Sequence, residues 1–157
     1  MTLQARILRL LFVIALAIYL GGFTFYSLVV IPILHERLGS SLETGLVTQR
    51  VTDSLNSFGS VTLALGWFIF WIKGVSHVQC GRGRRWYMRT LLASSTCLIV
   101  LFALHWVLDQ KLETNSRDGF YLWHRAYLWT STVQWFANIG LLAQSAGLVP
   151  PSAELSE

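Results

Sequence analysis

Four apolar runs of membrane-spanning length dominate the sequence and limit what the chain can fold into. They cover residues 7–34, 55–72, 90–108 and 120–143. A helix of about 20 apolar residues crosses the roughly 30 Å of hydrocarbon in a bilayer. Hydrophobic residues make up 54% of the 157 residues and charged residues only 13%, whereas soluble domains are about 25% charged. We therefore predict a single-domain, all-α integral membrane protein, an antiparallel bundle of four transmembrane helices.

The composition also excludes several classes of function. A net charge of +4 does not indicate nucleic-acid binding, because the basic residues lie between apolar runs and form no basic face of a soluble domain. The two cysteines, Cys80 and Cys97, make no disulfide framework. We find no hydrolase triad, phosphate loop or dinucleotide fingerprint, and the interiors of the four runs contain no Asp or Glu. Enzymatic activity would rest on the histidines alone.

The distribution of basic residues predicts the orientation. The connections between the runs are short, and cytoplasmic loops carry an excess of Lys and Arg. One side has seven such residues: Arg6, Arg9, Lys73, Arg82, Arg84, Arg85 and Arg89. The other side has five: Arg37, Arg50, Lys111, Arg117 and Arg125. Both termini are therefore expected in the cytoplasm, with residues 144–157 as a frayed cytoplasmic tail, and the membrane is expected to be a bacterial inner membrane.

The first outer connection is more than a loop. Apolar residues recur every three to five positions between Ser41 and Phe58, with polar residues between them. Ser41 can cap a helix there, and Glu43 favours its first turn. We expect a short amphipathic outer helix between the first and second spans, lying on the outer surface or leading directly into the second span.

Proline and glycine mark special positions in the first two spans. Pro32 predicts a kink or an end near the outer side of the first span. Gly59 and Gly66 form a seam of small residues, as do Gly21 and Gly22, where helices can approach closely. Such a seam serves either packing within the chain or contact with a partner helix.

One face of the fourth span is polar along its whole length. At 100° per residue, five polar side chains fall within about 80° of one another. They are His124, Tyr127, Ser131, Gln134 and Asn138. Polar groups do not face lipid without partners, so the stripe faces other helices or a polar cavity. It either fixes the bundle through interhelical hydrogen bonds or lines a pocket or path.

Three histidines fall near the outer ends of spans: His35, His105 and His124. Asp109 lies one helical turn beyond His105 on the same face. Converging imidazoles and carboxylates can bind copper or another transition metal, and two histidines can, less readily, ligate a haem. The alternative is that interfacial histidines reach only headgroups and water. Convergence requires an inward face on the third span made of Ser94, Leu98 and Leu101.

A dense basic segment separates the second and third spans. Its arginines are Arg82, Arg84, Arg85 and Arg89. They either hold anionic lipid headgroups or act only as a signal for topology.

Three stretches resemble a known family. The segments YLGGFTFYSLVVIPILHERLG and GLVTQRVTDSLN, together with WHRAYLWTSTVQW in the fourth span, are similar to the transmembrane-protein-205-like proteins, a four-span family of unknown function distantly similar to the copper-resistance D proteins. The resemblance implies a four-span fold and a link to metal or xenobiotic handling. The matching residues are Gly22, Pro32, His35, His124, Arg125, Gln134 and Trp135.

The leading functional expectation is a small non-enzymatic membrane protein that binds or passes a small solute or a metal ion. One alternative is a haem- or quinone-linked redox protein or subunit. Another is a structural subunit of a membrane complex. The expected partners are the lipid bilayer, anionic lipids, and a second copy or another membrane protein, but no nucleic acid.

Overall fold

The computed structural model describes residues 3–38, 41–72, 81–113 and 119–148, and this part of the chain is all-helical. α1 (Leu3–Phe25), a short π-helix η1 (Tyr26–Val30) and α2 (Ile31–Leu38) form one continuous rod. The other helices are α3 (Ser41–Trp71), α4 (Gly81–Glu113) and α5 (Phe120–Ala146). The prediction of an all-α chain is confirmed.

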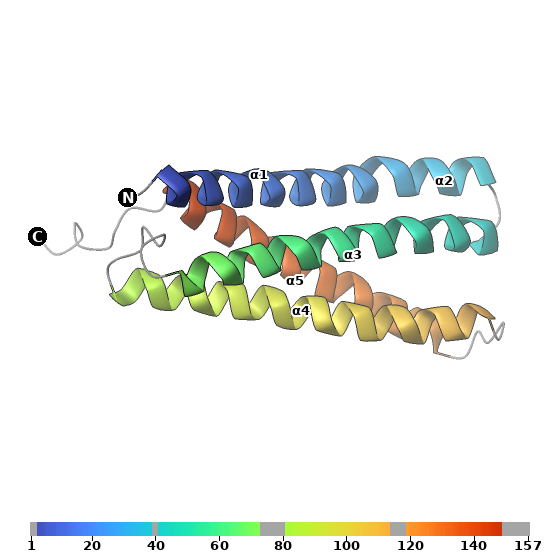
Figure 1. The fold of residues 1–157 in the computed structure, drawn as a ribbon. Coiled ribbons are helices and arrows are strands. Elements are labelled where there is room, and N and C mark those ends of the chain that lie inside the picture. The colour runs from blue at the N-terminus through green and yellow to red at the C-terminus, as the bar shows by residue number, and fades with distance from the viewer. Residues whose placement is uncertain (1–2, 39–40, 73–80, 114–118, 149–157) are drawn as a thin grey trace, which may run out of the picture.

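The four rods run antiparallel to their neighbours along the chain (Figure 1). α1 packs against α3 and α5, and α4 packs against the same two helices, most extensively against α5. At one end, the terminal end, lie the start of α1 and the end of α5; the Arg9 Nε there donates a hydrogen bond to the Ser145 carbonyl. The opposite end, the histidine end, holds α2 and the start of α5 (Figure 1).

Two of the described rods are long and apolar enough to cross a membrane, by length and composition. They are Leu3–Leu38 and Gly83–Lys111. α3 and α5 have 31 and 27 residues, but each carries several polar side chains that lower its hydropathy. Several of those polar side chains lie inside the bundle, where Asn56, Thr62, Gln134 and Asn138 are buried.

The first rod does not end at Pro32. It continues to Leu38 as α2, and the five residues of η1 precede the proline almost directly. Proline has no N–H to donate to the preceding turn, and its ring crowds the carbonyl four residues back. The wider π-helical turn, in which the Ile31 N–H reaches back to the Tyr26 carbonyl, lies where this crowding falls. π-helical turns of this kind often occur at functional sites.

The amphipathic segment from Ser41 to Phe58 does not form a separate helix. It is the first part of α3, which continues without a break to Trp71. No proline interrupts this stretch, so nothing in the sequence forces the helix to end between the two parts. The second of the two expected arrangements is therefore the one observed.

Two boundaries differ from those expected. α4 begins at Gly81, so the basic segment is largely helical rather than a loop. α5 continues to Ala146 and ends at Gly147, whose φ of +76° is the left-handed conformation that favours glycine. The helix therefore includes the first three residues of the expected tail; residues 149–157 and 73–80, with Cys80, lie outside the described residues.

The terminal half of the bundle is packed with apolar side chains. We call this cluster the apolar core; its members are Ala5, Phe12, Leu16, Leu63, Ile69, Tyr87, Leu91, Leu98 and Leu141. A Cβ added at Gly66 would lie 2.9 Å from the Phe12 ring, and one at Gly59 would lie 3.0 Å from the Tyr19 ring. Both glycines thus face α1 of the same chain, so this small-residue seam serves internal packing.

Candidate functional site

A column of polar side chains lies near the middle of the bundle and extends along α5 toward the histidine end. The polar column consists of Tyr19, Ser94, Tyr127, Ser131, Gln134 and Asn138. The Tyr19 hydroxyl on α1 donates to Gln134 Oε1 at 3.2 Å, and the Ser94 hydroxyl on α4 donates to Asn138 Oδ1 at 2.7 Å. Most of the polar stripe of α5 therefore faces its neighbours, because Ser131, Gln134 and Asn138 are all buried. His124, at the start of the stripe, is exposed.

The two buried amides of the polar column, Gln134 and Asn138, each use only part of their hydrogen-bonding capacity. The oxygens of Gln134 and Asn138 accept from hydroxyls, but among the described residues Gln134 Nε2 and Asn138 Nδ2 have no hydrogen-bond partner. The two residues are 2% and 1% exposed. A buried polar group without a partner costs about 1–3 kcal/mol, so these two donors are costly for a purely structural role.

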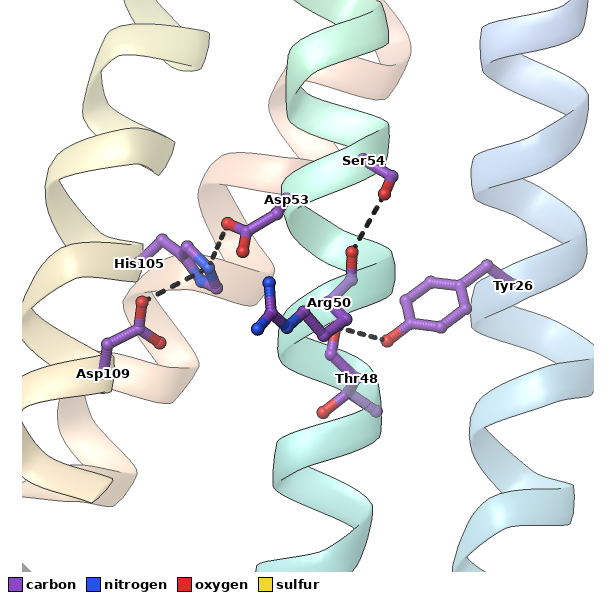
Figure 2. Close-up of polar contacts among 7 residues, drawn as sticks. All are labelled: Tyr26, Thr48, Arg50, Asp53, Ser54, His105 and Asp109. Carbon is purple, nitrogen blue, oxygen red and sulfur yellow. Dashed lines mark hydrogen bonds and ion pairs between the residues drawn. The ribbon is translucent and has the colours of Figure 1, made fainter. Parts of the chain in front are cut away.

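An acid–imidazole cluster lies nearer the histidine end than Ser94 and Asn138. Figure 2 shows its side chains, which come from α3 and α4. The His105 Nε2 on α4 lies 2.8 Å from Asp53 Oδ1 on α3 and 3.5 Å from Asp109 Oδ2 on α4. Both distances are short enough for ion pairs. The geometry at His105 Nε2 is not that of a hydrogen bond to either carboxylate. The His105 side chain is 11% exposed, Asp109 22% and Asp53 49%. The Asp53–His105–Asp109 cluster thus joins α3 to α4 at the edge of the interior.

Aromatic side chains connect this cluster with α5 and η1. The Tyr127 ring lies 6.3 Å from the His105 ring, between centroids. Tyr127 also interacts with Asn56 and, electrostatically, with Asp53 and Tyr26. Tyr26, in the π-helical turn, donates to the Thr48 carbonyl of α3 at 3.2 Å (Figure 2). Four helical segments therefore meet around the cluster.

The three predicted histidines lie in two different places. His105 belongs to the cluster, whereas His124 stacks on Phe120 with ring centroids 6.0 Å apart and interacts electrostatically with His35. None of the contacts in the described part of the chain joins His105 to His124. Within the same residues, no group of three or more His, Cys, Asp or Glu side chains could hold a metal ion. Cys97 is a free thiol.

The inward face of α4 is the one that the sequence predicted. Ser94 is 0% exposed, and Leu98, Leu101 and His105 are also buried. These residues repeat at three- to four-residue intervals, so they lie on one side of the helix. The face directs His105 toward the interior and leaves Asp109, one turn later, at its border.

Sequence reasoning missed Asp53 and Tyr19, the partners of His105 and Gln134. Asp53 lies within the Ser41 to Phe58 segment, which was expected to form an amphipathic outer helix. A signal for α3 does exist, since Asn56, Gly59, Thr62 and Gly66 repeat at three- to four-residue intervals and all four are buried. Because Asp53 continues that spacing, a reading of α3 as one helix places it on the inner face.

The structure also places the other residues that the sequence analysis singled out, namely Trp135 and the arginines. Trp135 Nε1 donates to the Thr24 hydroxyl at 3.0 Å, which ties α5 to α1, and Arg125 is exposed. At the terminal end, Arg84, Arg85 and Arg89 are exposed, and the Arg84 guanidinium lies 5.2 Å from the centre of the Phe70 ring. The Arg82 side chain lies outside the described residues.

Comparison with known proteins adds no identification. No protein-family model, curated protein or solved structure matches this chain. Any assignment of function therefore depends on the geometry of the polar column and of the Asp53–His105–Asp109 cluster.

Proposed function

We propose that this chain is a four-span membrane protein that binds a small polar solute in its interior, reached from the histidine end. The observation that carries the proposal is the inverted polarity of the bundle. Polar side chains are fully buried on α3, α4 and α5, while large apolar side chains on all four rods point outward. Representative exposed fractions are 58% for Ile18, 69% for Val61, 69% for Ile99 and 63% for Phe136. Lipid is the solvent that suits such a surface.

The lengths of α3 and α5 suit this arrangement. At 1.5 Å per residue, 31 and 27 residues extend about 46 and 40 Å, more than the roughly 30 Å of hydrocarbon. Their buried polar residues, such as Asn56, Thr62, Gln134 and Asn138, do not oppose insertion once the bundle forms, because these residues face the other helices. By the charge rule, the arginine-bearing terminal end is cytoplasmic and the histidine end is external.

The polar column next to the apolar core favours binding of a solute over its free passage through the bundle. The unpartnered amide nitrogens of Gln134 and Asn138 offer donors to a solute that carries acceptor oxygens. One turn beyond Asn138, the fully buried Leu141 begins the apolar core, which Phe12 and Leu91 complete from α1 and α4. A polar solute that enters past the Asp53–His105–Asp109 cluster therefore meets an apolar barrier before the terminal end.

Cysteine accessibility tests the proposal. In a full-length background carrying Cys80→Ser and Cys97→Ala, Ser131→Cys places a thiol in the polar column. The native Ser131 hydroxyl donates to the Tyr127 carbonyl of the same helix, so its replacement leaves the described hydrogen bonds between helices intact. In sealed proteoliposomes we expect a membrane-impermeant methanethiosulfonate to modify this cysteine from the histidine end. Leu141→Cys, in the apolar core, and Val133→Cys, on the outer surface, are the matched controls and should stay unmodified.

Reagents of opposite charge test whether the interior favours a cationic or an anionic solute. Two carboxylates flank the route, so a trimethylammonium reagent should react with Ser131→Cys faster than a sulfonate reagent of similar size. An unreactive Ser131→Cys in a correctly oriented, folded protein would contradict the proposal. Equal reaction of Ser131→Cys and Leu141→Cys would replace the binding site with an open path.

A further inference from the structure

The Asp53–His105–Asp109 cluster is built so that a proton changes its charge balance. Both carboxylates face the same imidazole nitrogen, Nε2, at 2.8 and 3.5 Å. A protonated imidazole carries N–H donors on both nitrogens, and a neutral one carries a single donor. Histidine is the side chain whose ordinary titration falls between pH 5 and 8. Loss of a proton from the imidazole therefore removes the positive charge that lies between the two carboxylates.

The charged and titratable groups around His105 come from every element that packs near it. α3 contributes Asp53 and, one turn earlier, Arg50, whose guanidinium extends on the same side of the helix (Figure 2). α4 contributes Asp109, and α5 contributes Tyr127, which in turn interacts with Tyr26 of η1. The two phenols stay neutral at these pH values, so the imidazole is the group that switches.

We propose that a proton bound by His105 closes the polar interior at the histidine end by tying α3 to α4. This inference rests on the proposed function, because it concerns access to the same interior. When His105 is protonated, its positive charge lies between the carboxylates of both helices and holds them together. When the proton leaves for water, the two carboxylates repel each other across a neutral ring. Asp53, with half of its side chain already exposed, then turns toward water and α3 separates from α4.

The location of the cluster explains why this contact controls access. His105 is buried and lies against Tyr127, the residue at the histidine end of the polar column. α3 and α4 are direct neighbours in the ring of helices, and the His105–Asp53 ion pair joins them near the histidine end. Loss of this contact frees the side of the bundle that leads to Tyr127 and Ser131.

The test measures how fast the trimethylammonium methanethiosulfonate modifies Ser131→Cys in proteoliposomes at pH 5.5 and at pH 8. Each rate is divided by that of Glu36→Cys, an exposed position at the same end, which removes the pH dependence of the thiol itself. We expect the corrected rate to rise at least about fivefold toward pH 8, as an imidazole titrates in this range. Asp53→Asn should reduce that ratio, and His105→Gln should abolish it with fast modification at both pH values.

His124→Gln is the matched control, because His124 titrates at the same end but interacts with His35 instead of the cluster. It should keep the full pH dependence. A corrected rate that does not change with pH, or a change that persists in His105→Gln, overturns the proton gate and leaves the proposed interior site in place. If Ser131→Cys is unreactive at both pH values, the proposed function itself fails. Where His105→Gln does not fold, Asp109→Asn and Asp53→Asn supply the same comparison.

Discussion

The apolar core and the polar column solve the same packing problem with opposite chemistry. In the apolar core, Phe12, Leu91 and Leu141 fill the space between the helices and are at most 1% exposed. In the polar column, near the middle of the bundle, Gln134 and Asn138 are buried as completely but bond to single hydroxyls. Close-packed apolar groups gain dispersion energy without directional requirements, whereas buried amides are favourable only when every donor and acceptor is satisfied. The contrast supports the proposal that the apolar core stabilises the bundle and the polar column binds a solute.

Glycine allows α1 to approach α3 both in the apolar core and beside the polar column. Gly66 lets the Phe12 ring approach α3 in the apolar core, and Gly59, two turns nearer the histidine end, lets the Tyr19 ring approach the same helix. The Tyr19 hydroxyl then reaches Gln134 on α5. The side chain that occupies the space beside each glycine decides whether the contact is apolar or polar.

The largest expected effect lies in the apolar core. Leu141→Ala should lower the free energy of unfolding by about 2–5 kcal/mol, because removal of a fully buried leucine side chain leaves a cavity. Unfolding in mixed micelles measures this change. Leu148→Ala, at a site that is 75% exposed, is the control and should change stability little. A loss below about 1 kcal/mol for Leu141→Ala would mean that the terminal half does not supply the stability.

A smaller effect is expected where helices approach at glycine. Gly66→Ala should destabilise the bundle by roughly 1–3 kcal/mol, since the new Cβ would meet the Phe12 ring at 2.9 Å and Leu91 at 3.2 Å. Gly22→Ala is the matched control, because its Cβ would meet only Leu55, at 3.7 Å, an ordinary contact. That variant should be neutral or slightly more stable, because alanine favours helix. Equal unfolding free energies for the two variants would show that the close approach at Gly66 does not constrain the fold.

The smallest effect is expected in the polar column. Ser94→Ala and Asn138→Leu should each change the free energy of unfolding by about 1 kcal/mol. If the proposed membrane location holds, a double-mutant cycle should give a coupling of about 0.6 kcal/mol, the value typical of hydrogen bonds between membrane helices. The coupling measures the 2.7 Å hydrogen bond between the two side chains. A coupling of several kcal/mol would instead make the polar column a main source of stability.

Some features of the candidate site followed from sequence periodicity. The spacing of Ser131, Gln134 and Asn138 placed them on one helical face, and the rule that polar groups avoid lipid directed this face inward. The same argument placed His105 beside Ser94, Leu98 and Leu101. What spacing did not provide was the partner on another helix. Asp53 is 52 residues from His105 along the chain, and periodicity describes a single helix at a time.

The sequence by itself determined that this chain is helical and apolar on its outer faces, and which side of α4 and α5 faces inward. These properties depend on composition and on a period of 3.6 residues, both of which act locally. Only the tertiary structure decided that α3 runs unbroken from Ser41 to Trp71, that Asp53 rather than His124 is the neighbour of His105, and that the polar column ends at Leu141. The physical reason is that the register and rotation of one helix against another depend on side-chain packing across the bundle, such as the Tyr19 ring on Gly59, and no single helix contains that information.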